Sequence, residues 1–255
     1  MKYLIIDIGN TNIVFAVYND NKILQKWRIS TLIKRTMDEY IFWFNSSIKD
    51  NWIFKDIIIG SVVPDITEEL KLAALSFFNK QALVVSEDFE INFPVKVDNP
   101  AEIGTDRLVN ALCAWNLYQK PSIIVDFGTA TTFDVVGNDG VYLGGVIAPG
   151  INLSISALHA AAARLPRIAI TKPKHIIGKN TVSAMSSGVY WGYIGLIKCL
   201  LMKIETEIGY KMTILATGGL AKLFVSEIPK DVIINNDLTI HGLYIAYKES
   251  KKYNE

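Results

Sequence analysis

Two segments of the sequence place a carboxylate, a glycine and several polar side chains directly after an apolar run. The first is DIGNTN at residues 7–12, and the second is DFGTATT at residues 126–132. Glycine lets a backbone approach an anion closely, and neighbouring hydroxyl groups add hydrogen-bond donors. Both segments therefore fit loops that bind phosphate. The carboxylates of Asp7 and Asp126 cannot bind phosphate themselves, so each either holds a cation or a hydrated metal ion, or fixes its loop.

The two segments belong to a longer internal repeat. Residues 3–21 can be laid over residues 122–140 without a gap, and each copy then shows a strand, an acidic loop and a hairpin turn. The superposition matches Asp7 with Asp126, Gly9 with Gly128, and Asn19-Asp20 with Asn138-Asp139. Because Asn-Asp turns are common, two unrelated hairpins are the alternative explanation. We interpret the repeat as two related domains, 1–120 and 121–255, with the boundary near Lys120.

Composition narrows the class of protein and of partner. A chain of 255 residues, half of them hydrophobic, is long enough for one large domain or two of ordinary size. The formal charge of +1, with both signs mixed along the chain, gives no electrostatic footprint for nucleic acid or an anionic membrane. The N-terminal apolar run is too short for a signal peptide. We therefore predict a cytoplasmic protein without a nucleic-acid or membrane partner.

The elements that position the two loops can be anticipated from apolar periodicity and turn residues. An antiparallel beginning followed by alternating helices and strands favours an α/β fold with mixed sheets. The expected strands are 3–6, 13–18, 23–29, 56–62, 81–86, 122–125, 141–147 and 212–216, and the second loop is 126–129. The expected helices are 36–48, 64–78, 106–118, 153–164, 181–208 and one from about 238, with an irregular segment at 92–99.

Other residues with chemical potential have ordinary explanations. Cys113 and Cys199 lack the spacing of a metal or redox motif. Motifs of the forms G-x-x-x-x-G-K-[ST], G-x-G-x-x-G and G-x-S-x-G do not occur in the sequence. Asp106 falls in the first turn of a predicted helix, where the helix dipole favours a carboxylate by about 0.3–1 kcal/mol. On these grounds alone, Asp106 is either a helix-start residue or a functional acid.

Six motifs in order give the chain a resemblance to a known family. They are DIGNTN at 7–12, IGTDR at 103–107, DFGTATT at 126–132, GGVIAPG at 144–150, GKNT at 178–181 and ATGG at 216–219. This set resembles the type III pantothenate kinases, and the resemblance runs from residue 4 to about 246. That family belongs to the superfamily of acetate and sugar kinases, heat-shock chaperones and actin.

The resemblance implies a fold and an activity. The fold is α/β with two actin-like (ribonuclease H-like) domains, each a mixed sheet opening with a hairpin and flanked by helices, and an active site in the cleft between them. The activity is ATP-dependent phosphorylation of pantothenate to 4'-phosphopantothenate, the first step of coenzyme A biosynthesis. The family also implies magnesium, a monovalent cation (K⁺ or NH₄⁺) and a homodimer.

The resemblance also implies roles for individual residues. Asp106 would be the general base, Asp126 would hold the monovalent cation, and Asp7 would order Mg²⁺ through water. The residues implied to bind ATP are Asp7, Ile8, Gly9, Asn10, Thr11, Asn12, Ile13, Val14, Thr129, Gly218 and Gly219. The residues implied to bind pantothenate are Gly104, Thr105, Asp106, Arg107 and Thr181. Thr181 also has a generic interpretation as a helix cap.

Two other functions remain open from the sequence. The family includes accessory factors named for effects on transcription, so a non-catalytic regulator is one alternative. Another kinase or phosphatase of the superfamily, acting on acetate, a sugar or polyphosphate, is the second. Gly-Thr-Asp-Arg at 104–107 beside Asn-Pro-Ala-Glu at 99–102 favours pantothenate over these.

Overall fold

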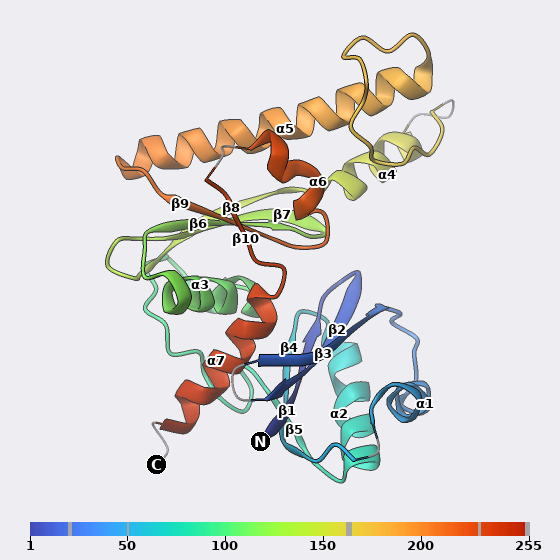
Figure 1. The fold of residues 1–255 in the computed structure, drawn as a ribbon, viewed down its shortest axis with the longest axis vertical. Coiled ribbons are helices and arrows are strands. Elements are labelled where there is room, and N and C mark those ends of the chain that lie inside the picture. The colour runs from blue at the N-terminus through green and yellow to red at the C-terminus, as the bar shows by residue number, and fades with distance from the viewer. Residues whose placement is uncertain (20–21, 50, 162–164, 229–230, 253–255) are drawn as a thin grey trace. The chain divides into compact units, whose positions relative to one another are not determined.

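The computed structural model describes residues 1–19, 22–49, 51–161, 165–228 and 231–252, which form two compact units (Figure 1). The first unit contains residues 1–94, 98–113 and 237–255, and the second contains 95–97 and 114–236. Each unit is built on one five-stranded mixed sheet, as the repeat predicts.

The first sheet has the strand order β3-β2-β1-β4-β5. Its strands are β1 (Lys2–Ile8), β2 (Asn12–Asn19), β3 (Lys22–Ser30), β4 (Phe54–Ser61) and β5 (Ala82–Val84). The first three form an antiparallel meander, and β4 and β5 then add parallel to β1. The parallel connection from β4 to β5 is made through a helix, as parallel strands require.

Helices α1 (Met37–Ser47) and α2 (Pro64–Phe78) cover one face of this sheet. Thr36 and Glu39 form a capping box that starts α1, and Pro64 occupies the first turn of α2. Since side chains alternate along a strand, one side of β1 supplies Leu4, Ile6 and Ile8 to the core beneath the helices. Tyr3, Ile5 and Asp7 lie on the opposite face.

That opposite face packs against α7 (Leu238–Lys252), which returns to the first unit from the end of the chain. The side chain of Leu243 fills the space above Gly60, and the Tyr247 hydroxyl donates to Asp56. On α3 (Thr105–Tyr118), the Val109 carbonyl lies so close to Gly242 that a side chain could not fit there. Helix α7 is therefore a structural part of the first unit.

The second sheet repeats the topology of the first, in the order β8-β7-β6-β9-β10. Its strands are β6 (Ser122–Phe127), β7 (Ala130–Val136), β8 (Tyr142–Pro149), β9 (Thr213–Thr217) and β10 (Ile233–Ile234). Again the first three are antiparallel, and the last two add parallel. The duplication thus extends from the hairpin to the whole sheet.

The strand register refines the repeat. Asp7 and Asp126 are each the penultimate residue of their strand, so the predicted equivalence holds. Asp7 pairs with Val14, seven positions on, whereas Asp126 pairs with Thr132, six positions on. The first loop is therefore one residue longer, and the gapless superposition is displaced by one residue after the loop.

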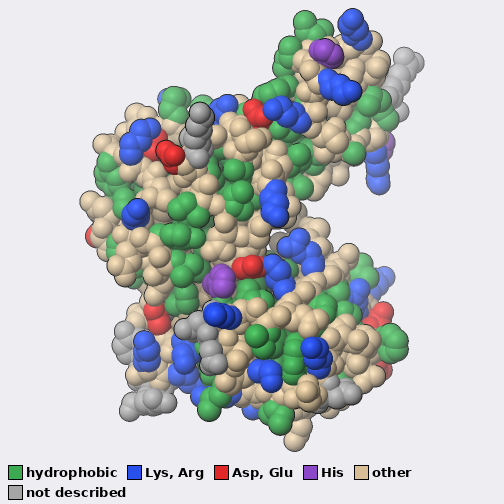
Figure 2. Space-filling view, viewed as in Figure 1, with side chains coloured by type: hydrophobic (Ala, Val, Ile, Leu, Met, Phe, Trp, Pro, Cys, Tyr) green, Lys and Arg blue, Asp and Glu red, His purple; other side chains and the backbone are tan. Residues whose placement is uncertain are grey.

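Helices α4 (Ile151–Ala161) and α5 (Thr181–Ile208) and the short α6 (Ala221–Phe224) pack with the second sheet around one core. Two 3₁₀ turns, Pro100–Glu102 and Val225–Glu227, complete the regular structure of the described residues. Within the described ranges, α5 is the longest helix, yet none of the helices is both long and apolar enough to cross a membrane. On the face shown in Figure 2, Lys and Arg side chains are dispersed among neutral ones.

The predicted elements agree with the structure except at a few places. The predicted domain boundary near Lys120 follows the end of α3, whereas the compact units divide within α3, between Cys113 and Ala114. Residues 237–255 belong to the first unit rather than to the second. Asp126 and Phe127, expected in a loop, end β6. Helix α4 begins at Ile151, and residues 162–164 lie outside the described residues, as do 20 and 21 of the first hairpin turn. Helix α6 and strand β10 are too short to show a periodic pattern.

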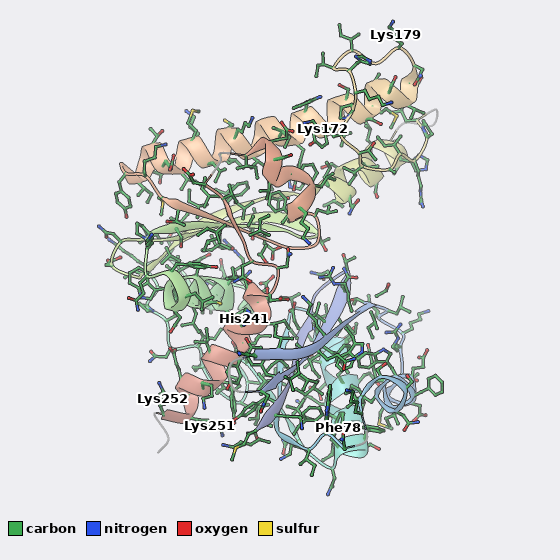
Figure 3. The ribbon with its side chains drawn as sticks, in the orientation of Figure 1. Phe78, Lys172, Lys179, His241, Lys251 and Lys252 are labelled. Carbon is green, nitrogen blue, oxygen red and sulfur yellow. The ribbon has the colours of Figure 1, made fainter. Side chains whose placement is uncertain are left out.

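The contact between α7 and the first sheet includes a partly buried histidine. His241 lies near the start of α7 (Figure 3), and its Nδ1 shares a hydrogen bond with the Tyr18 hydroxyl of β2. Tyr244 stacks on Tyr18, while Asp237, whose carbonyl accepts the His241 backbone N–H, forms an ion pair with Lys26 of β3. Burial lowers the pKa of His241 below its ordinary value. The folded chain therefore favours the neutral ring.

We expect the free energy of unfolding to fall as the pH drops below about 6.5, where an unfolded histidine takes up a proton that the folded chain excludes. One such group accounts for at most about 1.4 kcal/mol per pH unit. Urea unfolding of the wild type and of His241→Gln, each at about pH 8 and about pH 5.5, measures this. The substitution should weaken the pH dependence, whereas His175→Gln, at an exposed position, should retain it. Equal pH dependence in all three proteins would contradict the assignment.

Candidate functional site

The first loop, residues 9–11, is held by hydrogen bonds on both sides of its exposed tip. The Gly9 N–H donates to the Asn12 carbonyl at 3.0 Å. Thr31, directly after β3, donates its hydroxyl to the Gly9 carbonyl at 2.6 Å and its N–H to the Thr11 carbonyl at 2.9 Å. Asn10 and Thr11 are exposed. Thr31 is a loop anchor that sequence reasoning missed, because nothing near it in the sequence marks it.

Three of the predicted ATP-binding residues lie in the core. Ile8 and Ile13 are fully buried, and Val14 is 9% exposed. The side chains of Ile8 and Ile13 belong to the first core, so these two positions can reach a ligand through their backbone groups at most. The Ile8 carbonyl already accepts the Val62 N–H at 3.0 Å. The exposed polar part of the first loop is therefore Asn10 and Thr11, with Gly9 and Asn12 partly exposed beside them.

The second loop is shorter and exposes Gly128 and Thr129 between β6 and β7. Beneath it, the buried hydroxyl groups of Thr131 and Tyr193 form a hydrogen bond of 2.6 Å. Burial, together with the charge of Asp126, raises the pKa of Tyr193 to about 12, against the opposing effect of the Thr131 hydrogen bond. Tyr193 is therefore a neutral hydroxyl under the loop, and its role was not predicted.

Asp126 and Gly218, predicted separately, lie in contact. Asp126 pairs with Thr217 at the end of β9, and Gly218 follows in the left-handed region with φ +90°. A Cβ at Gly218 would lie 2.7 Å from the Phe127 nitrogen and closer still to Asp126 Oδ1. Glycine is thus required here both by conformation and by space. The turn after β9 covers the Asp126 carboxylate.

Asp106 is the second residue of α3 and is partly buried. Its Oδ1 accepts the Arg107 backbone N–H at 2.8 Å, and a Cβ at Gly104 would lie 2.6 Å from the same oxygen. Burial raises the pKa of the Asp106 carboxyl, and the hydrogen bond and charge of Arg107 oppose the rise. A higher pKa makes a carboxylate a better proton acceptor. The geometry therefore suits Asp106 to general-base chemistry.

The neighbours of Asp106 form the start of α3. The Gly104 carbonyl accepts the Leu108 N–H at 3.1 Å, so Gly104 takes the N-cap position and Thr105 the first helical position. Gly104, Thr105 and Arg107 are all partly exposed. The predicted pantothenate residues 104–107 therefore share a single turn of backbone.

Thr181 is exposed at the first position of α5. The cap of this helix is Asn180, whose side chain accepts the Ser183 N–H at 2.9 Å, so the generic interpretation of Thr181 as the cap is wrong. Gly178 lies against the backbone of Ser183 and Ala184 and leaves no space for a side chain. The Thr181 hydroxyl is thus not used to start its helix.

The predicted site residues divide between the two units. Residues 7–14 and 104–107 belong to the first, and Asp126, Thr129, Thr181, Gly218 and Gly219 belong to the second. Among the described residues, His, Cys, Asp and Glu side chains do not gather in groups of three or more that could enclose a metal ion. Asp7 and Asp126 each supply one carboxylate, which fits a cation that keeps water and phosphate oxygens as its other ligands.

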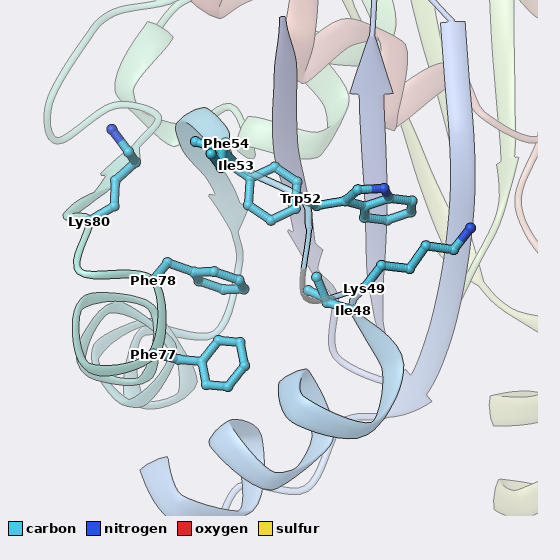
Figure 4. A pocket seen from close by; sticks show the side chains of 8 residues that line it. All are labelled: Ile48, Lys49, Trp52, Ile53, Phe54, Phe77, Phe78 and Lys80. Carbon is cyan, nitrogen blue, oxygen red and sulfur yellow. The ribbon is translucent and has the colours of Figure 1, made fainter.

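In the first unit, a pocket of about 340 Å³ lies where α1 and α2 end and β4 begins, at the end of the sheet opposite the first loop (Figure 4). Ile8, at the first loop, pairs with Ser61 at the far end of β4. In Figure 4 the rings of Phe54, Phe77 and Phe78 lie together, and the amino groups of Lys49 and Lys80 extend away from them. The pocket is lined by Ile48, Lys49, Trp52, Ile53, Phe54, Phe77, Phe78 and Lys80. It contains none of the predicted site residues.

Solved structures resemble this chain in fold. A conserved protein assigned to the Baf family of transcriptional activators from Campylobacter jejuni matches with a TM-score of 0.60 and 21% identity, over 98% of this chain and 99% of its own. The activator of the 2-hydroxyisocaproyl-CoA dehydratase from Clostridium difficile, with bound ADPNP, matches with a TM-score of 0.57 and 14% identity, over 100% and 97%. A ROK family glucokinase from Streptomyces griseus, with glucose and AMPPNP, gives 0.53 and 12%, over 99% and 100%. These likenesses confirm the two-domain actin-like fold.

Sequence comparison is more specific. The family model described as type III pantothenate kinase matches residues 3–203. A type III pantothenate kinase of Acidiphilium cryptum is 48% identical over 244 residues, covering 94% of this chain and 92% of the relative. One from Paramagnetospirillum magneticum is 48% identical over 252 residues, covering 97% of each. The chain therefore belongs to the type III pantothenate kinase family.

Proposed function

We propose that this chain transfers the γ-phosphoryl group of ATP to the primary hydroxyl of pantothenate, giving 4'-phosphopantothenate and ADP. Family membership supplies the substrate class. The main support for proton transfer in this reaction is the partly buried carboxylate of Asp106 at the start of α3, whose pKa is raised by burial. Phosphoryl transfer depends mainly on positioning and electrostatics, and the acceptor alcohol needs a group that takes its proton.

In this mechanism, the pantothenate hydroxyl oxygen attacks the γ-phosphorus as the bond to the β-phosphate oxygen of ADP breaks. Asp106 accepts the hydroxyl proton, and Arg107, Gly104, Thr105 and Thr181 hold pantothenate. ATP is assigned to residues 7–14, where the exposed tip is Asn10 and Thr11, and to Thr129, Gly218 and Gly219. Magnesium, when bound, neutralises charge on the transferring phosphates. Asp7 is assigned to order it through water.

Incubating the purified protein with ATP, magnesium, potassium and pantothenate tests the function, and phosphopantothenate is the expected product. Product from acetate, a sugar or polyphosphate instead would favour the second alternative, and no product from any acceptor would favour a regulatory protein. We also assign the enzyme to the cytoplasm and to a homodimer. Sedimentation equilibrium tests the dimer.

We expect Asp106→Asn to lower kcat by roughly 10²–10⁴, because the amide cannot accept the hydroxyl proton. The matched control is Asp38→Asn. Asp38 is the second residue of α1, as Asp106 is of α3, but Asp38 is exposed whereas Asp106 is partly buried. The control should keep wild-type kcat. If Asp106 merely complements its helix dipole, both variants will turn over normally and differ from the wild type in stability alone.

We expect activity to be higher in potassium or ammonium chloride than in sodium chloride of equal ionic strength, because Asp126 holds a monovalent cation beside the nucleotide. Asp126→Asn should remove most of this preference as well as lower activity. Initial rates in the three salts, for wild type and variant, measure it. Equal wild-type rates in all three salts would contradict the assignment of Asp126 as a ligand of a monovalent cation.

We expect Thr181→Val to raise the KM for pantothenate while leaving the stability of the protein unchanged, since the Thr181 hydroxyl is exposed and does not cap α5. Asn180→Ala, at the neighbouring position, should lower the free energy of unfolding by about 1 kcal/mol. Steady-state kinetics and urea unfolding of both variants separate the two effects. A wild-type KM in Thr181→Val would show that the hydroxyl does not contact pantothenate.

A further inference from the structure

Gly150 connects β8 to α4 and lies directly against the second loop. A Cβ at this position would be 2.8 Å from the Gly128 carbonyl oxygen and 2.8 Å from the Thr129 carbonyl carbon, and closer still to the Thr129 oxygen. Ordinary van der Waals contact begins at 3.4 Å, so these backbone atoms would have to retreat by at least about 0.6 Å. Gly150 does not adopt a positive φ. The closeness of the loop, rather than backbone conformation, therefore requires glycine here.

Of the two segments in this contact, the start of α4 is held by more interactions than the second loop. The Gly150 carbonyl accepts the Ser154 N–H at 2.9 Å and the Ser154 hydroxyl at 3.1 Å. The next residue, Ile151, is 1% exposed, and both it and Ile155 belong to the second core. Gly128 and Thr129, by contrast, are exposed. A methyl group added at Gly150 would thus displace the loop more readily than the helix.

The contact also sets the direction of the loop amides. The carbonyl oxygens of Gly128 and Thr129 face Gly150. In a trans peptide, the N–H of the following residue points the opposite way, so the N–H groups of Thr129 and Ala130 point away from Gly150. A phosphate-binding loop depends on where its N–H groups point.

We propose that Gly150 is a positioning residue for ATP: by admitting the loop carbonyls at close range, it fixes the orientation of the second phosphate loop. This inference rests on the proposed function, in which Thr129 contacts the nucleotide. Gly150 itself touches the loop and not the substrate.

The test is Gly150→Ala with Gly195→Ala as the matched control, because a Cβ at Gly195 meets nothing within 4 Å. Since a small displacement in a site can cost up to about 100-fold, we expect Gly150→Ala to raise the KM for ATP by roughly 10- to 100-fold. The KM for pantothenate should stay at the wild-type value. Calorimetric titration with a nonhydrolysable ATP analogue should show a matching rise in Kd. Gly195→Ala should match the wild type in all three measurements.

A wild-type KM and Kd for the nucleotide in a folded Gly150→Ala protein would overturn the proposal, as would an equal rise in both substrate KM values. Hydrogen exchange of the wild type provides a second test that does not depend on the variant folding. The nucleotide analogue should slow amide exchange in the first turn of α4 together with residues 128–130, and protection of the loop alone would contradict the coupling. Failure of the wild type to bind the analogue or to form phosphopantothenate would instead refute the proposed function.

Discussion

The parallel pairing of β6 with β9 is the interaction on which the second loop depends. It sets Asp126 beside Thr217, so that the chain leaving β9 turns directly over the Asp126 carboxylate. That turn is possible because Gly218 has no side chain and accepts a φ of +90°. Since the carboxyl ends of parallel strands share one edge of a sheet, Asp126 and Thr217 meet there although they are far apart in the sequence.

The same arrangement occurs at the first sheet, where β1 pairs in parallel with β4 and Asp7 lies opposite Gly60. The two units nevertheless stabilise their loops differently. Hydrogen bonds from Thr31 hold the first loop from the side of β3. The backbone of the second loop contacts Gly150, and the hydroxyl groups of Thr131 and Tyr193 form a buried hydrogen bond next to this loop. A duplicated topology thus preserves the position of the aspartate but not the contacts around it.

Much of the fold could be predicted from the sequence, because its elements carry strong periodic patterns and clear turn residues. The limits of α2 and α5 and the start of α7 agree closely with the apolar period and the helix-start residues. The placement of α7 could not be predicted. Its apolar face fits either sheet as a pattern, and the choice rests on contacts with Gly60, Tyr18 and Asp56 that are over 180 residues away in the sequence.

For the candidate site, the two acidic glycine loops, the Asp106 segment and the family could be recognised from the sequence, because these depend on residue types at short spacing. The tertiary structure alone decided that Ile8 and Ile13 are buried, that Asn180 rather than Thr181 caps α5, and that Gly150 lies against the second loop. The burial of Ile8 and Ile13 and the contact at Gly150 depend on packing between segments that are apart in the sequence, and the cap of α5 depends on the backbone conformation at Asn180. Local spacing sets the chemistry that a segment offers, and packing sets which groups can use it.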